Sequence, residues 1–254
     1  MNSRRALLLA ALSCLACADK ARGPEPLLLG EVGALSGAEA SFGLSTRDGI
    51  ALAVEEANAD GGVRGRPVQL RVYDSQSRPE EAASAARRLI AQDKVLAILG
   101  EAASSSSLAM APVAQAARVP MVTPTSTNPQ VTEVGDYIFR ACFLDEAQGG
   151  AMARYARMTL GLERVALLTE VTSAYSEGLT QVFVTRFEAL GGQIVARGNV
   201  CAQMNSHQTG VRRYGVGHRV SGAFAQVYRF ALQQGQSGFA IFRRVTGSKG
   251  SLMQ

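Results

Sequence analysis

The chain has no tryptophan, two histidines and four cysteines among its 254 residues. Both histidines, His207 and His218, lie near the carboxyl end, so a serine–histidine nucleophile pair would depend on that region alone. The cysteines are too few for a disulfide framework, and no cysteine–histidine spacing typical of a metal site occurs. The phosphate-loop pattern is absent, and the serine-rich stretch lacks the nucleophile-elbow pattern. We therefore expect no enzyme activity, no cofactor and no metal.

Acidic residues are missing from residues 199–254, which contain seven arginines and lysines. Since the whole chain carries a net charge of +5, residues 1–198 carry a net charge of −2. A nucleic-acid-binding protein needs a basic face on a folded domain, so we expect no nucleic-acid partner. The composition of the basic tail resembles a shifted reading frame of a GC-rich gene. A divergent natural carboxyl terminus is the alternative.

The amino-terminal apolar run of eleven residues, ALLLAALSCLA, is too short to span a membrane as a helix. It follows two arginines and is typical of a signal-peptide core. The stretch resembles a bacterial lipoprotein signal, and Cys17 is favoured over Cys14 as the lipidated residue because it leaves a longer apolar core. We expect a signal at 1–17 and a linker at 18–26, which places the protein in the cell envelope on a lipid anchor. An ordinary secretory signal and a buried amino-terminal helix are the alternatives.

Apolar strand patterns alternate with helical patterns between residues 27 and 196. This alternation predicts an α/β fold with a parallel sheet and helices on both faces. We expect a first lobe at 27–142, a partial second lobe at 143–198 and the basic tail at 199–254. The expected strands are 27–33, 68–74, 95–99, 119–123, 137–140, 164–168 and 193–196, and the expected helices are 45–59, one beginning at 79, 104–117, 146–160 and 176–190. In the tail, 222–234 is a weak candidate for a helix and 239–245 for a strand.

Polar loops follow three of the expected strands, namely ALSGAEASFG, GEAASSSS and TPTSTNP. Ligands of open parallel sheets bind beyond the carboxyl ends of the strands. Ser104 or Ser105 is expected to cap a helix whose free N–H groups and dipole favour a small carboxylate. Residues 123–127 add hydroxyl and carbonyl groups from the next strand–helix unit. The alternative is that the serines only cap the helix.

Longer stretches are similar in order and spacing to the periplasmic leucine/isoleucine/valine-binding proteins, the substrate-binding subunits of ABC importers with the type I periplasmic binding fold. The first lobe carries the resemblance in GALSGAEASFG, GIALAVEEANADGGVRGRPVQLRVYDSQSRPEEAASAARRLI and ILGEAASSSSLAMAPVAQAARVPMVTPTSTNP. FRACFLDEAQGGAMARYA and RVALLTEVTSAYSEGL resemble the family's crossing into the second lobe. The resemblance runs from about residue 27 to 197.

The resemblance implies two lobes that close over an amino acid and deliver it to a membrane permease. By position, it implies that Ser104 holds the ligand carboxylate through its hydroxyl and backbone N–H, with Ser105 beside it. Thr127 is implied to contact the charged end groups of the ligand, and Thr125 to offer its backbone carbonyl to the ammonium.

Two aromatic residues complete the expected site. The resemblance implies that Phe42 packs on the ligand side chain and that Tyr175 closes over the ligand from the second lobe. From the residues alone, Phe42 is equally compatible with the core, and Tyr175 with a helix entry capped by Ser176.

The resemblance ends after residue 197. The later part of the family carries an acidic residue for the ligand ammonium, and the tail offers no carboxylate. We therefore expect a nearly complete first lobe and an incomplete second lobe with exposed apolar surface. Two other functions stay open: a sensor or receptor domain of the same fold for amides or other small polar solutes, and, from a different class, a serine hydrolase.

Overall fold

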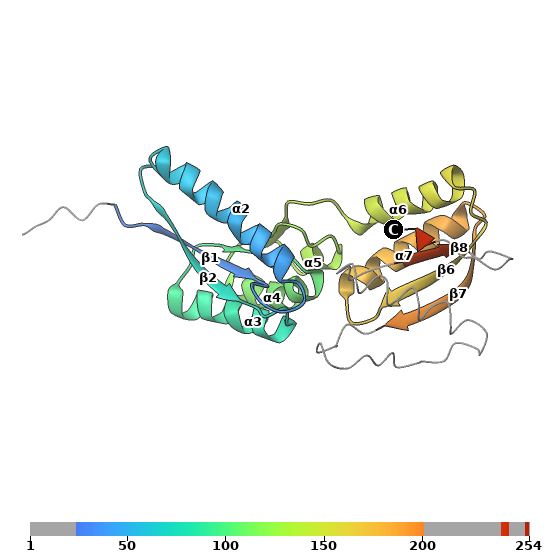
Figure 1. Ribbon diagram of the computed structural model, residues 1–254. Coiled ribbons are helices and arrows are strands. Elements are labelled where there is room, and N and C mark those ends of the chain that lie inside the picture. Colours follow the sequence, from blue (N-terminus) through green and yellow to red (C-terminus); the bar gives the residue numbers. More distant parts are fainter. Residues whose placement is uncertain (1–23, 201–239, 244–251, 254) are drawn as a thin grey trace, which may run out of the picture.

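The computed structural model describes residues 24–200, 240–243 and 252–253. They form two α/β lobes that lie next to each other along the long direction of the molecule (Figure 1). The expected signal with Cys14 and Cys17 lies outside the described residues, as does the weak helix candidate at 222–234.

The first lobe is built on a five-stranded sheet in the order β2-β1-β3-β4-β5, with all described pairs parallel. This arrangement confirms the expected parallel α/β class. Its strands are β1 (Leu27–Gly33), β2 (Val68–Asp74), β3 (Ile98–Leu99), β4 (Met121–Thr123) and β5 (Ile138–Arg140).

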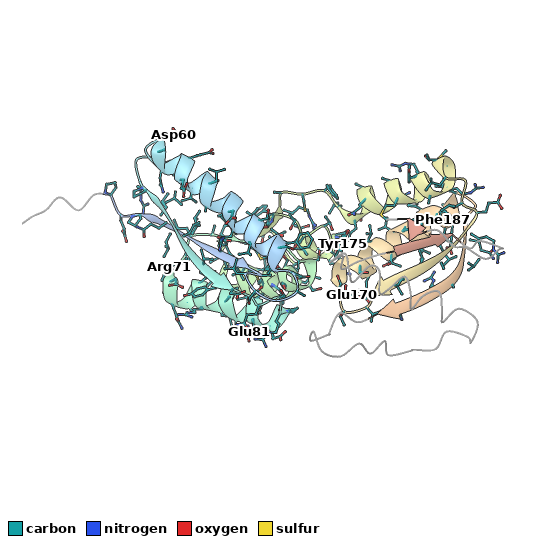
Figure 2. The ribbon with its side chains drawn as sticks, viewed as in Figure 1. Asp60, Arg71, Glu81, Glu170, Tyr175 and Phe187 are labelled. Atoms are coloured by element: carbon teal, nitrogen blue, oxygen red, sulfur yellow. The ribbon has the colours of Figure 1, made fainter. Side chains whose placement is uncertain are left out.

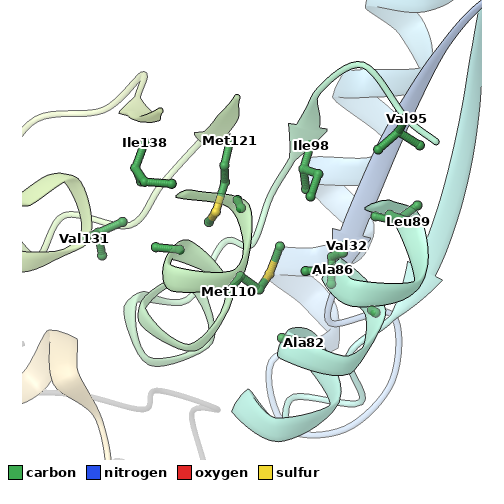
Figure 3. Close-up of a cluster of buried hydrophobic side chains, with 13 residues drawn as sticks. Val32, Ala82, Ala86, Leu89, Val95, Ile98, Met110, Met121, Val131 and Ile138 are labelled. Atoms are coloured by element: carbon green, nitrogen blue, oxygen red, sulfur yellow. The ribbon is translucent and has the colours of Figure 1, made fainter. Parts of the chain in front are cut away.

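The core of this lobe lies on one face of the sheet, beneath α3 (Pro79–Arg88) and α4 (Ser104–Ala117). Helix α3 begins at a proline, continues into the π-helical turn η1 (Leu89–Asp93), and presents small alanines that let it approach the strands closely. Figure 3 shows how side chains of both helices meet those of the strands, including Val32, Ile98, Met110 and Met121. The short helix α5 (Gln130–Glu133) closes the same side.

Helix α2 (Ala40–Ala59) lies on the opposite face of the sheet and packs mainly against β1 and β2. Beyond it, Leu99, Val122 and Phe139 stand next to one another in register on β3, β4 and β5. Phe139 is 49% exposed, and the other two are half-buried. We expected exposed apolar surface on the second lobe, yet this face of the first lobe also leaves apolar side chains in contact with solvent.

The second lobe carries a four-stranded sheet in the order β7-β6-β8-β9. Strands β6 (Arg164–Glu170) and β7 (Gln193–Val200) run parallel, whereas β8 (Ala240–Arg243) pairs antiparallel with β6 and β9 (Leu252–Met253) with β8. Helix α6 (Asp145–Arg154), its extension η2 (Tyr155–Thr159) and α7 (Ala174–Ala189) cover the sheet. The stacked rings of Phe183 and Phe187 lie in the core beneath them.

Most expected elements are present, with shifted ends. Helix α2 begins at residue 40, five residues earlier than expected, so Phe42 stands on a helix and not in a loop. Strand β3 covers only two of the five expected residues, whereas β6 and β7 extend to 170 and 200. The weak strand candidate at 239–245 is confirmed as β8, which gives the second lobe more strands than the two expected.

Candidate functional site

The four consecutive serines lie where β3 leads into α4. The expectation that Ser104 or Ser105 caps this helix is wrong, because α4 already begins at Ser104 and Ala103 occupies the N-cap without a side-chain bond. An alanine side chain cannot accept a hydrogen bond, so the first amides of the helix receive no side-chain cap. The Oγ of Ser104 instead lies 3.5 Å from the backbone N–H of Asn128 and accepts from it.

Three hydroxyl groups join this helix start to the loop after β4. Thr123, Ser107 and Ser126 donate to the backbone carbonyl of Glu101 over 2.6, 2.8 and 3.1 Å. These side chains are buried. Because β3 and β4 are adjacent parallel strands, both loops leave the same edge of the sheet. The hydroxyl-rich sequences of the two loops therefore form one connected polar site, as expected.

Thr127 and Asp145 are the described residues of this site whose side-chain oxygens lack well-formed hydrogen bonds. The Thr127 hydroxyl and both carboxylate oxygens of Asp145 are buried and lack a hydrogen bond of good geometry within the described chain. They are neighbours: the Asp145 backbone N–H donates to the Thr127 carbonyl at 3.0 Å. Burial raises the pKa of Asp145, while the nearby Thr127 hydroxyl lowers it. A buried carboxylate whose near neighbour is only a neutral hydroxyl is costly, so this pair favours a positively charged or hydrogen-bonding ligand group.

Sequence reasoning missed Asp145. It stands at the first position of α6, between the lobes, and acidic residues are common in the first turn of any helix. Only the fold brings it next to Thr127. An acidic group is thus available within the described residues, although the tail supplies none.

The other expected residues surround the same edge of the sheet. Thr125 is exposed and donates its hydroxyl to the Ala102 carbonyl at 2.9 Å. Phe42 is 62% exposed, so it does not belong to the core. Tyr175 is half-buried and accepts a bond from Gln148 at 2.9 Å. Figure 2 shows Tyr175 and Glu170 at the side of the second lobe that faces the first.

The alternative interpretation of Tyr175 is corrected in one detail. The N-cap of α7 is Ser173, whose side chain accepts from the backbone N–H of Ser176 at 3.3 Å, so Tyr175 lies inside the helix. Ser105 also reaches this helix start, because its Oγ accepts from the Ala174 N–H at 2.9 Å.

Carboxylates with raised pKa values gather near the site. Burial raises the pKa of Glu39 to about 7, and the charges of Glu101 and Glu170 add to the shift. Glu101 is buried and accepts from Ser75 and from the Ala103 N–H. Burial also raises the pKa of Glu170, at the end of β6. The surroundings are therefore acidic, which disfavours a ligand whose only charged group is negative unless helix amides offset it.

Other kinds of site are not indicated. Among the described residues, no group of acidic, histidine and cysteine side chains is arranged to hold a metal, and no helix has the length and apolar character needed to cross a membrane. A cavity of about 310 Å³ lies between α6 and α7, and none of the expected ligand residues lines it. Cys142, at the end of the first lobe, is a free thiol.

The fold and the paired hydroxyl loops define a two-lobed α/β protein with a polar site at the strand ends of its first lobe. Residues 26–211 match the periplasmic binding protein family, and the chain belongs to that family. The solved structures that it resembles, named below, share its type I arrangement of parallel sheet and helices.

Several relatives are named for the ligand that they bind. The chain is 36% identical to an amino acid binding protein of Pseudomonas aeruginosa over 65% of its own length and 44% of the relative. It is 31% identical to the Leu/Ile/Val-binding protein of Escherichia coli K12, over 71% of this chain and 49% of that protein. The chain therefore spans about half the length of these relatives.

Among solved structures, a leucine binding protein of Thermotoga maritima is 42% identical with a TM-score of 0.67, covering 70% of this chain and 50% of that one. A branched-chain amino acid transporter substrate binding protein of Streptococcus pneumoniae, in complex with isoleucine, is 32% identical with a TM-score of 0.67 and coverages of 72% and 52%. A solute binding protein of Rhodopseudomonas palustris, in complex with 3,4-dihydroxybenzoic acid, is 28% identical with a TM-score of 0.64 and coverages of 69% and 47%.

Proposed function

We propose that this chain is the solute-binding component of an ABC importer and binds a small amino acid, with a branched-chain side chain preferred, between its two lobes. The observation that carries the proposal is the buried pair of Thr127 and Asp145 beside the start of α4, whose side chains adjoin each other and make no hydrogen bond of good geometry to another described group. An amino acid carries a partner for each of two groups in this site. Its carboxylate can accept hydrogen bonds from the uncapped amides at the start of α4, and its ammonium can pair with the buried carboxylate of Asp145.

Each ligand residue has a proposed role. Ser104 holds the carboxylate through its hydroxyl and N–H, and Thr127 contacts the end groups. Thr125 offers its backbone carbonyl to the ammonium, which Asp145 neutralises. Support for the Thr125 role comes from its backbone carbonyl, which accepts no hydrogen bond from the described residues, while its hydroxyl donates to the Ala102 carbonyl.

The side chain of the ligand is proposed to lie between two aromatic residues. Phe42 stands exposed near the beginning of α2, where its ring is available for an apolar contact. Tyr175 approaches from the second lobe at the beginning of α7. Ser105 is proposed to contribute to the carboxylate site as well, since its hydroxyl proton has no acceptor among the described residues.

The cellular setting follows from the same proposal. The chain acts outside the cytoplasm, is anchored to the envelope through lipidated Cys17, and passes its ligand to a membrane permease. We propose binding without catalysis, because the relatives named above are binding proteins and the chain belongs to the periplasmic binding protein family. Both histidines of the chain lie outside the described residues.

Relatives that bind benzoic acids keep a second ligand class open. The structures related at 28% and 26% identity contain 3,4-dihydroxybenzoic acid and 4-hydroxybenzoate, which have a carboxylate but no ammonium. The buried carboxylate of Asp145 favours the amino acid for this chain, because nothing in a hydroxybenzoate would neutralise it.

Calorimetric titration of the full chain tests the proposal. We expect saturable binding of L-leucine, L-isoleucine or L-valine and much weaker binding of 4-hydroxybenzoate and acetamide. Tight binding of the benzoate or the amide with no amino acid binding would reject the amino-acid assignment. Serine-dependent hydrolysis of an ester by the chain, lost in Ser104→Ala, would reject the assignment as a non-enzyme.

A further inference from the structure

Two side chains of the first lobe hold both backbone polar groups of one residue in the second lobe. The Oγ of Ser105 accepts from the Ala174 N–H at 2.9 Å, and the Nδ2 of Asn128 donates to the Ala174 carbonyl at 2.8 Å. Ala174 is the first residue of α7, so its N–H has no acceptor within its own helix. The partners come from residues 69 and 46 positions away in the chain.

These two side chains lie next to the proposed ligand residues in sequence. Ser105 follows Ser104 at the start of α4, and Asn128 follows Thr127 in the loop after β4. Asn128 is also fixed within its own lobe: its Oδ1 accepts from the Gln130 N–H at 3.0 Å, its side chain is 5% exposed, and its backbone N–H is the group that meets Ser104. A displacement of either ligand loop would therefore move a group that touches the second lobe.

Gly178, one turn further along α7, allows the close approach. A Cβ at this position would lie 2.9 Å from the Nδ2 of Asn128 and 2.7 Å from the Oδ2 of Asp145. Both distances are shorter than ordinary van der Waals contact, so any larger residue would displace the Asn128 and Asp145 side chains from the first turn of α7.

We propose that Ser105 and Asn128 form a clamp on Ala174 that sets the position of the second lobe, and with it Tyr175, relative to the ligand loops. Both are positioning residues in this role. That the clamp closes the lobes over an amino acid rests on the proposed function; the clamp itself does not. Because the Ser105 oxygen accepts from Ala174, its proton stays available to a ligand carboxylate, which links ligand binding to lobe position.

Amide hydrogen exchange of the ligand-free full chain, followed residue by residue by NMR, tests the clamp. The Ala174 N–H is predicted to be protected in the wild type and to lose at least tenfold of that protection in Ser105→Ala. The Glu177 N–H, which bonds the Ser173 carbonyl at 3.0 Å inside α7, is the internal control and is predicted to change less than twofold. Ser105→Thr keeps an acceptor and is predicted to restore the protection of Ala174.

Asn128→Asp isolates the second bond. An aspartate retains an acceptor for the Gln130 N–H but has no proton to donate to the Ala174 carbonyl, so this variant is predicted to deprotect Ala174 as well. Three results would each overturn the clamp. The Ala174 N–H could exchange fast in the wild type, its exchange rate could be unchanged in Ser105→Ala, or Ala174 and Glu177 could lose their protection together in that variant. Absence of amino acid binding in calorimetry would reject the proposed function and leave this exchange result standing.

Discussion

The side-chain oxygen of Ser104 lies 3.5 Å from the backbone nitrogen of Asn128, and this contact joins the start of α4 to the loop after β4. Two segments that are 24 positions apart thereby share one polar surface. The contact is long for a hydrogen bond, so a ligand carboxylate can replace it with little loss. The Ser104 hydroxyl is therefore available to bind a ligand, whereas the Ser107 hydroxyl is held by its short hydrogen bond to the Glu101 carbonyl.

Ser104→Ala is predicted to weaken amino acid binding about tenfold to a hundredfold, because a hydrogen bond to a charged group contributes roughly 1.5–3 kcal/mol. Its unfolding free energy should change by less than about 1 kcal/mol, since the native bond that it removes is long. Ser45→Ala, on the exposed side of α2, is the matched control and should bind like the wild type. Equal affinities of the two variants in calorimetry would show that Ser104 is not a ligand residue.

Asp145→Asn is predicted to abolish discrimination between an amino acid and its deaminated analogue. Removing the buried negative charge takes away the partner of the ammonium, so L-leucine should bind at least tenfold more weakly. Binding of 4-methylpentanoate, which has the same side chain and carboxylate but no ammonium, should be unchanged or stronger. If the variant loses both ligands equally, Asp145 acts on the shape of the site and not on the ammonium.

Glu31 gives the fold a pH dependence that can be measured. Its carboxylate is fully buried on β1 without a hydrogen-bond partner in the described chain, and burial raises its pKa from 4.5 to about 7. The folded chain therefore binds this proton more tightly than the unfolded chain, and the unfolding free energy decreases as the pH rises from about 4.5 to 7. The loss is at most roughly 3 kcal/mol for a shift of this size.

Glu31→Gln is the variant that isolates this effect. It removes the ionisation and is predicted to raise the unfolding free energy at pH 8 while changing it little at pH 5. A shallower slope should remain, because the pKa of Glu39 is also raised to about 7. Denaturant titrations at both pH values check this prediction, and an equal effect of the variant at pH 5 and pH 8 would contradict it.

Gly43 and Gly49 on α2 offer a matched pair of substitutions. A Cβ at Gly43 would lie 2.1 Å from the Ala34 carbonyl oxygen, whereas nothing lies within 4 Å of one at Gly49. Gly43→Ala is predicted to lower the unfolding free energy by roughly 1–3 kcal/mol through the backbone clash. Gly49→Ala should raise it by roughly 0.5–1 kcal/mol, because alanine favours the helix. Equal effects in thermal unfolding would mean that α2 does not pack against β1 as described.

The fold class was predictable because its signals are local. Strand β1 reads as an apolar run that only Glu31 interrupts, Pro79 marks the start of α3, and the glycine pair 191–192 marks the end of α7. The ends of β3 and α2 were not predictable in the same way. The strand assignment at 95–99 depends on pairing with β1 and β4, which is not a property of nearby sequence. The first turn of α2 lies directly against the Ala34 backbone at Gly43, a tertiary contact that the helical periodicity of residues 45–59 does not reveal.

The sequence predicted which loops form the candidate site, but not the role of each residue in them. Hydroxyl groups after consecutive strands indicated a shared polar edge, and Ser104 and Thr127 do lie on neighbouring loops. The different roles of the serines could not be predicted from the sequence, because they depend on tertiary contacts. Ser107 donates to the Glu101 carbonyl within the first lobe, whereas Ser105 accepts from Ala174 of the second lobe. Asp145 was missed for the same reason.

The most direct test of the central claim is a calorimetric titration of the full chain with L-leucine, compared with its Thr127→Val variant. Valine keeps the shape of threonine and removes only the buried hydroxyl beside Asp145, and Thr185→Val on the exposed side of α7 is the matched control. We predict saturable one-to-one binding by the wild type and the control, and a loss of at least tenfold in affinity for Thr127→Val. Equal binding by all three proteins, or no binding of any branched-chain amino acid by the wild type, would contradict the account.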